Sequence, residues 1–95
     1  MKIKVTSAAK QDIKNAVDWY NDQKNDLGLA FKTYVIQAIE KIKLNPFAFQ
    51  KRYKTNRIKF LRKYPYGIHY KLTEDFIIIL AVFHTSRSPK NWKKR

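Results

Sequence analysis

The residues best suited to chemistry in this sequence lie near its C-terminal end. His84 and Arg87 stand three positions apart, directly after a long apolar run. Such a pair suits a phosphate group, because arginine offers a two-pronged hydrogen-bond donor and histidine exchanges a proton near neutral pH. The plainer interpretation is that His84 hydrogen-bonds locally and Arg87 ties down the tail. Spacing alone favours the plainer interpretation.

Trp92 stands among cations close behind this pair, between Lys90 and the final Lys-Lys-Arg95. An aromatic ring set in positive charge can stack on a nucleic-acid base while its neighbours hold phosphates. The alternative is that the indole folds back and caps the edge of the core. Core capping is the favoured interpretation, with the surrounding lysines left in solvent.

A second group of cations occupies the middle of the chain, where no acidic residue occurs between Gln50 and Thr73. Solvated protein surfaces usually mix both signs of charge. A run of this length with one sign therefore indicates an anionic ligand. The side chains of this run expected on or near the sheet face are Arg52, Lys54, Arg57, Lys59, Arg62, Lys63, His69 and Lys71.

Several classes of site are excluded or disfavoured by composition. The absence of cysteine excludes disulfides, thiolate metal sites and a cysteine nucleophile. Two histidines and scattered acids disfavour a metal site, and two glycines cannot form a glycine-rich phosphate loop. We expect no metal and no cofactor. Any catalysis would run on Lys, Arg, His and Tyr, which suits cleavage of an RNA phosphodiester by its own 2′-hydroxyl.

Charge and length define the class of protein. The 95 residues carry 21 Lys and Arg against 7 Asp and Glu, for a net charge of +14, and they suffice for one domain. A surface so charged repels itself, so the partner must be anionic: nucleic acid, an anionic membrane face or an acidic protein.

The N-terminus lacks the apolar core of a signal peptide, and the longest apolar run is too short for a bilayer. A cytoplasmic location is expected.

The N-terminal half predicts a strand and two helices. Ile3 and Val5 alternate with lysines, as in a half-buried strand. Apolar residues then recur at helical spacing. The first helix is predicted to take Ser7 as its N-cap and to end near residue 25. The second covers residues 27–44 and ends before Pro46, because the residue before a proline is pushed out of the helical region.

The C-terminal half predicts three strands. Residues 57–60 and 68–72 alternate apolar and charged side chains, and residues 76–83 are uniformly apolar, as in a central strand covered on both faces. The predicted fold is α+β: an N-terminal strand, an antiparallel two-helix hairpin, then a three-stranded antiparallel meander, with both helices on one face of the sheet.

Alternation also predicts which side chains share a face of that sheet. The apolar set is expected to face the helices, and it comprises Ile58, Phe60, Ile68, Tyr70 and Leu72. The cationic set is expected on the opposite face, and it comprises Arg57, Lys59, His69 and Lys71.

The order of elements and a series of short motifs resemble the RelE/ParE superfamily along essentially the whole chain. The motifs are Asp12-Ile13, Trp19-Tyr20, Leu27-Gly28, Phe31, Asn45-Pro46, Arg57, Tyr64-Pro65-Tyr66 and His84-x-x-Arg87-x-Pro89-x-x-Trp92. The resemblance implies a plasmid-stabilisation toxin that inhibits growth. It also implies an antitoxin, encoded beside the toxin, that wraps it with a helix and an extended segment and often carries a DNA-binding domain. An acidic antitoxin would neutralise the +14 surface, and a toxin–antitoxin hetero-oligomer is expected.

The superfamily divides by target. ParE-like members inhibit DNA gyrase, and RelE-like members cut messenger RNA on the ribosome. The long second helix, Tyr64-Pro65-Tyr66 and His84-x-x-Arg87 look closer to the ParE side. Arg57, Lys59, His84 and Arg87 are the catalytic candidates if the protein is instead an RNase, and a non-toxic nucleic-acid-binding module is the third hypothesis. The residues expected to engage the target are Arg57, Lys59, Arg62, His84, Arg87, Trp92 and Arg95. The first helix and the sheet edge are the expected antitoxin surface.

Overall fold

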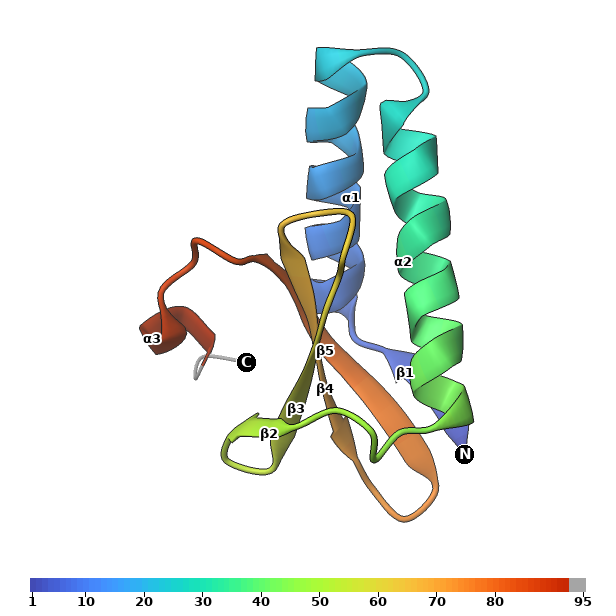
Figure 1. Cartoon of the computed structure of the whole chain (residues 1–95), viewed down its shortest axis with the longest axis vertical. Helices are drawn as coiled ribbons and strands as arrows, with labels where there is room; N and C mark the ends of the chain where they lie inside the picture. The colour runs from blue at the N-terminus through green and yellow to red at the C-terminus, as the bar shows by residue number, and fades with distance from the viewer. Residues whose placement is uncertain (93–95) are drawn as a thin grey trace.

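A five-stranded sheet carries a helical hairpin on one face (Figure 1). The computed structural model describes residues 1–92. The elements in chain order are β1 (Lys2–Val5), α1 (Ser7–Gln23), α2 (Leu27–Leu44), β2 (Lys51–Tyr53), β3 (Asn56–Phe60), β4 (Tyr66–Leu72), β5 (Phe76–His84) and α3 (Pro89–Trp92). The predicted α+β order of one strand, two helices and a three-stranded meander is confirmed. Two short elements, β2 and α3, are additional.

Thr6, rather than the expected Ser7, is the N-cap of α1, and its hydroxyl accepts a hydrogen bond from the Ala9 N–H at 3.1 Å.

The two helices pack closely because their contact contains a glycine. A Cβ added at Gly28, in the first turn of α2, would lie 2.5 Å from the Val17 carbonyl oxygen of α1. The Gly28 N–H also donates to Asn21 Oδ1 at 2.8 Å. A side chain at position 28 would therefore push the hairpin apart.

The strands lie in the order β1-β5-β4-β3-β2, and β1 pairs with β5 in parallel while the other pairs are antiparallel. The long β5 thus lies between β1 and β4, as expected for an apolar strand covered on both faces. Its residues Ile77 and Ile79 join the core beneath the helices, together with Phe31, Ile68 and Tyr70.

Side chains of the α1 region close the edge of β5 that β1 leaves open. The pairing with β1 ends at Val5 and Ile79. Beyond it, the Thr6 hydroxyl donates to the Leu80 carbonyl at 3.4 Å, and a carboxylate oxygen of Asp12 accepts from the Val82 N–H at 3.0 Å. Both β5 groups therefore have a hydrogen-bond partner without a neighbouring strand.

The predicted distribution of side chains between the two faces of the sheet is wrong for β3. Arg57 pairs with Tyr70 and Lys59 with Ile68, whereas Ile58 pairs with His69. Directly paired residues share a face. Arg57 and Lys59 therefore lie on the helix side with the core residues of β4. The Leu61 N–H bonds the Tyr66 carbonyl at 2.9 Å, and this turn sets the pairing register.

The face of the sheet away from the helices has a small apolar layer instead of the predicted cationic face. Ile58, His69 and Phe83 are all nearly inaccessible to solvent. The Trp92 ring of α3 lies 5.0 Å from the His69 ring and 5.5 Å from the Tyr53 ring. Figure 1 shows α3 on this side, away from the helical hairpin. The core-capping interpretation of Trp92 is confirmed.

Neither long helix in residues 1–92 combines the length and apolarity needed to cross a membrane.

Candidate functional site

Four of the cationic side chains expected at the site fall into two separate regions of the molecule. One is a pocket between α2 and β3, here called the α2–β3 pocket, which contains Lys59 and Arg62. The other is the end of β5 with the turn that follows it, here called the β5 terminus, which contains His84 and Arg87. Each is described in turn, because their separation bears on what the protein can do.

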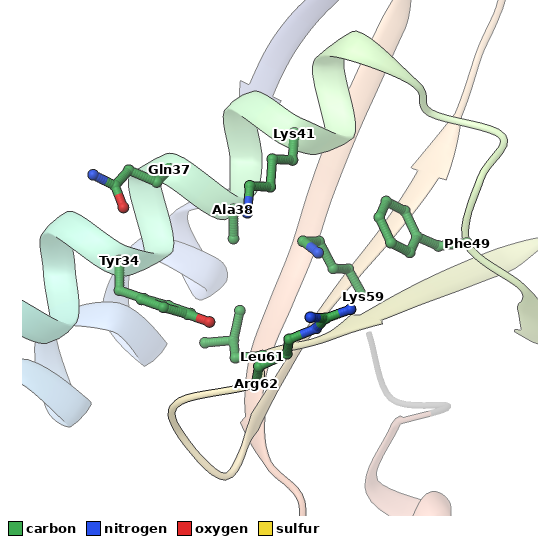
Figure 2. A pocket seen from close by; sticks show the side chains of 8 residues that line it. All are labelled: Tyr34, Gln37, Ala38, Lys41, Phe49, Lys59, Leu61 and Arg62. Atoms are coloured by element: carbon green, nitrogen blue, oxygen red, sulfur yellow. The ribbon is translucent and has the colours of Figure 1, made fainter.

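The α2–β3 pocket has a volume of about 370 Å³. Residues 34, 37, 38 and 41 line it from one face of α2, and residues 59, 61 and 62 line it from β3 and the turn after it. In Figure 2, Lys41 reaches in from the helix, and the Lys59 and Arg62 side chains reach in from the strand side. The full lining is Tyr34, Gln37, Ala38, Lys41, Phe49, Lys59, Leu61 and Arg62.

The pocket gathers positive charge without an acidic residue in its lining. Burial lowers the pKa of Lys59, and the neighbouring Lys41 and Arg62 charges lower it further, while Tyr34 opposes the shift. The Lys59 ammonium lies 4.4 Å from the centroid of the Phe49 ring, where a cation–π contact supports it. The ammonium group thus lies in a place where an anion would stabilise its charged form.

Arg57 does not line this pocket. Its Nη1 donates to the Phe49 carbonyl at 2.8 Å, and its guanidinium lies 5.3 Å from the centroid of the Phe47 ring. The Tyr70 hydroxyl donates to the Pro46 carbonyl at 2.7 Å in the same loop. Arg57 therefore holds the connection between α2 and β2, which forms one wall of the pocket through Phe49.

At the β5 terminus, His84 and Arg87 are held by local contacts. His84 Nδ1 accepts the Ser86 N–H at 3.0 Å and lies 2.8 Å from the Ser86 hydroxyl. The Arg87 guanidinium lies 4.3 Å from the centroid of the Phe83 ring. The predicted local hydrogen bonding of His84 is confirmed. Since Nδ1 accepts, the neutral imidazole carries its proton on Nε2, which remains a potential donor to a partner.

The β5 terminus lies beside α1 rather than α2. His84 and Arg87 line a hollow of about 230 Å³ with Asp12, Trp19 and Tyr66. Trp19 of α1 is 55% exposed there, which is unusual for so large an apolar side chain. A partly exposed indole beside an arginine is a combination enriched at protein-binding surfaces.

A row of aromatic rings lies between the two regions. Tyr34, which lines the pocket, is 5.3 Å from Tyr64 between ring centroids, and Tyr64 is 5.0 Å from Phe31. Phe31 is 5.1 Å from Tyr66, and Tyr66 is 5.2 Å from His84. The cations of the pocket and those of the β5 terminus consequently occupy opposite ends of this row and do not form one site.

Two of the residues expected to engage the target lie in the tail. Arg95 lies outside the described residues, and Trp92 is packed on His69 and Tyr53.

The sequence interpretation overlooked Tyr34 and Lys41 as pocket residues. Their seven-residue spacing, with Ala38 between them, places all three on one face of α2 and was the available signal. In residues 1–92, no group of three or more His, Asp, Glu or Cys side chains could hold a metal ion.

The fold matches a known structure of a toxin–antitoxin system. A chain of the solved structure described as "Chromosomal ParDE TA system from P. aeruginosa" superposes with a TM-score of 0.81 at 18% sequence identity. The match covers 88% of this chain and 95% of that chain. At this identity the likeness establishes the fold.

Sequence comparison identifies the family. Toxin ParE2 of Mycobacterium tuberculosis is 28% identical over 89 residues, which are 93% of this chain and 85% of that protein, in both the CDC 1551 and H37Rv strains. Residues 3–89 match the family described as "ParE toxin of type II toxin-antitoxin system, parDE". This chain belongs to the ParE toxin family. The predicted relationship is confirmed, and the protein is the toxin of a type II toxin–antitoxin pair.

Proposed function

We propose that this toxin inhibits DNA gyrase and that a cognate acidic antitoxin neutralises it in a hetero-oligomer. The proposal also places the toxin in the cytoplasm, together with gyrase and the antitoxin. The observation that carries the proposal is the match of residues 3–89 to the ParE family. The charge of +14 supports an acidic antitoxin, because a bound polyanion would relieve the self-repulsion of the toxin.

The division of the cations also favours gyrase inhibition over RNA cleavage. Cleavage requires a proton-transferring group and phosphate-stabilising cations around one phosphodiester. Of the RNase candidates, Lys59 lines the α2–β3 pocket, Arg57 holds the loop before β2, and His84 and Arg87 lie at the β5 terminus. A protein surface can engage such dispersed charges at once, whereas a single phosphodiester cannot.

Purified toxin added to gyrase, ATP and relaxed plasmid should block supercoiling, and it should leave protein synthesis in a ribosome-containing extract unchanged. Prior mixing with the antitoxin should restore supercoiling. Within the target-binding set, the His84→Ala/Arg87→Ala double variant should require at least tenfold more toxin, as expected for a loss of about 1.4 kcal/mol of binding free energy. Lys10→Ala, an exposed cation on α1 away from the β5 terminus, is the control.

Ribosome-dependent cuts in messenger RNA with normal supercoiling would replace the proposal by the endonuclease alternative. If overexpression were harmless and binding to nucleic acid fell steeply with salt, the third hypothesis of a non-toxic binding module would stand instead.

A further inference from the structure

We propose that the α2–β3 pocket binds the terminal phosphate or pyrophosphate group of a small phosphorylated ligand, such as a nucleoside diphosphate or triphosphate. The proposal concerns a second binding function of the toxin and does not depend on gyrase being the target. It rests on the charges, hydrogen-bond donors and size of the pocket.

Three cations reach the pocket from three different segments. Lys41 comes from α2, Lys59 from β3 and Arg62 from the turn after β3. Cations held this close repel one another, and no carboxylate in the lining compensates them. A ligand that carries two or three negative charges on one group would remove this repulsion. Guanidinium and ammonium groups are the usual side-chain partners of phosphate.

Tyr34 supplies a neutral donor beside these cations. Its hydroxyl oxygen accepts the Lys63 N–H at 3.3 Å, so its own proton is available for a bond to another acceptor. In Figure 2 the Tyr34 oxygen points from α2 toward the strand side of the pocket, where Arg62 and Leu61 lie. The phenol can therefore donate to a phosphate oxygen that the arginine also holds.

Ala38, Phe49 and Leu61 form an apolar part of the lining and limit water on one side of the charges, while Gln37 adds a polar amide. Leu61 and Ala38 are buried, and Phe49 supports the Lys59 ammonium. Electrostatic attraction is stronger where water is partly excluded. The volume of about 370 Å³ lies within the range of about 300–1,000 Å³ that is usual for small-molecule sites.

The charge of the pocket favours a terminal phosphate over the backbone of a nucleic acid. A phosphodiester has one negative charge, whereas a terminal phosphate has nearly two and pyrophosphate has more. Three uncompensated cations are best matched by the more highly charged group. The backbone diesters of a strand would satisfy the pocket only in part.

The molecule contains a matched control for this proposal. A second hollow, of about 270 Å³, lies between α1 and α2 and is lined by Lys10, Lys14 and Lys32 with Ile13 and Val17. It has the same number of cations, but the Lys14 ammonium is paired with the Asp18 carboxylate at 2.7 Å. Binding by general attraction to the +14 surface would treat both hollows alike.

The test is titration calorimetry with inorganic pyrophosphate at physiological salt on three forms of the full chain. The pocket variant is Lys41→Gln/Lys59→Gln/Arg62→Gln, and the control is Lys10→Gln/Lys14→Gln/Lys32→Gln. Both lower the net charge from +14 by three, to +11. The expected result is one site in the unaltered toxin, at least tenfold weaker binding in the pocket variant, and less than a twofold change in the control.

Amide shifts in nuclear magnetic resonance spectra should locate the bound pyrophosphate at residues 34–41 and 59–62. ATP should compete with pyrophosphate, and single-stranded RNA without terminal phosphates should not. The single variant Lys41→Gln, on the exposed surface of α2, provides a folded protein if the triple variant is unstable. Equal weakening in both triple variants, or equally tight binding of RNA lacking terminal phosphates, would overturn the proposal. The gyrase assay is separate, so either proposal can fail alone.

Discussion

The two faces of the sheet are packed in very different ways. Two helices of 17 and 18 residues cover one face and bury Phe31, Ile68 and Tyr70 completely. The other face is covered over His69 by α3, a helix of only 4 residues, through the ring of Trp92. Strand β5 nevertheless has buried residues on both sides, such as Ile79 and Phe83.

This difference indicates that the two faces of the sheet contribute unequally to the stability of the domain. Stability should come mainly from the helix face, where burial is complete and continuous. The layer beneath α3 rests on a few ring contacts, so it should contribute less and open more readily. Three predictions test this comparison, in order of decreasing effect on the free energy of unfolding.

The largest effect is expected for Phe31→Ala on the helix face. Phe31 is fully buried and contacts the rings of Tyr20, Tyr64 and Tyr66. Its truncation should lower the free energy of unfolding by about 3–5 kcal/mol, because transfer energy and packing are both lost. Urea unfolding measures this change. Leu29→Ala on the same helix is the control, since Leu29 is 63% exposed and should change stability by less than about 0.5 kcal/mol.

The second effect is a loss of stability at alkaline pH caused by Tyr70. Burial raises the pKa of Tyr70 to about 12, and the Arg57 charge opposes this only in part. The folded state therefore keeps the proton that the unfolded chain loses near pH 10. This stabilisation is fully present below pH 10 and is lost as pH rises toward 12, by at most about 2.7 kcal/mol.

Urea unfolding of the unaltered toxin and of Tyr70→Phe at pH 8, 10 and 11 isolates this effect. The phenylalanine variant loses the 2.7 Å hydrogen bond to Pro46 but has no proton to release. The difference in stability between the two proteins should therefore shrink above pH 10. A constant difference over this range would mean that Tyr70 is not buried as the helix face requires.

The smallest of the three effects is expected for Trp92→Ala on the opposite face. Trp92 is half-buried, and its truncation should cost about 1–2 kcal/mol, well below the value for Phe31. Thermal unfolding measures this change. Trp92→Phe should cost less, because the indole Nε1 is buried without a hydrogen-bond partner in the described part of the chain. If Trp92→Ala destabilised the protein as much as Phe31→Ala, the contrast between the faces would be wrong.

Most of the fold could be predicted from the sequence because its elements are strongly periodic. The 27–44 helix has four-residue and three-residue apolar spacing, and residues 76–83 form one uniform apolar run. The strand β2 could not be predicted in this way, since Lys51, Arg52 and Tyr53 show no alternation and the strand pairs with β3 through an irregular register.

The phase of β3 shows why a site is harder to predict than a fold. Phe60 and Leu61 are adjacent apolar residues, so one of them must face each side of the sheet. Alternation alone does not say which, because the choice depends on the turn that aligns β3 with β4. Leu61 lies in the core and Phe60 is 43% exposed, which places Lys59 beside α2. Alternation therefore predicts one surface for Arg57, Lys59 and His69, whereas the structure places His69 on the opposite face from the other two.

The closure of the β5 edge by Thr6 and Asp12 has a consequence for self-association of the chain before folding is complete. An unpaired apolar edge, such as the edge of β5 beyond Ile79, is a template for intermolecular strand addition and fibril growth. The Asp12 bond to Val82 spans 70 positions of sequence, so this protection exists only after the first helix and the last strand have met. A chain that contains β5 but has not yet docked α1 against it exposes this edge. We therefore expect the Asp12 carboxylate to protect this edge against self-association in addition to accepting the Val82 hydrogen bond.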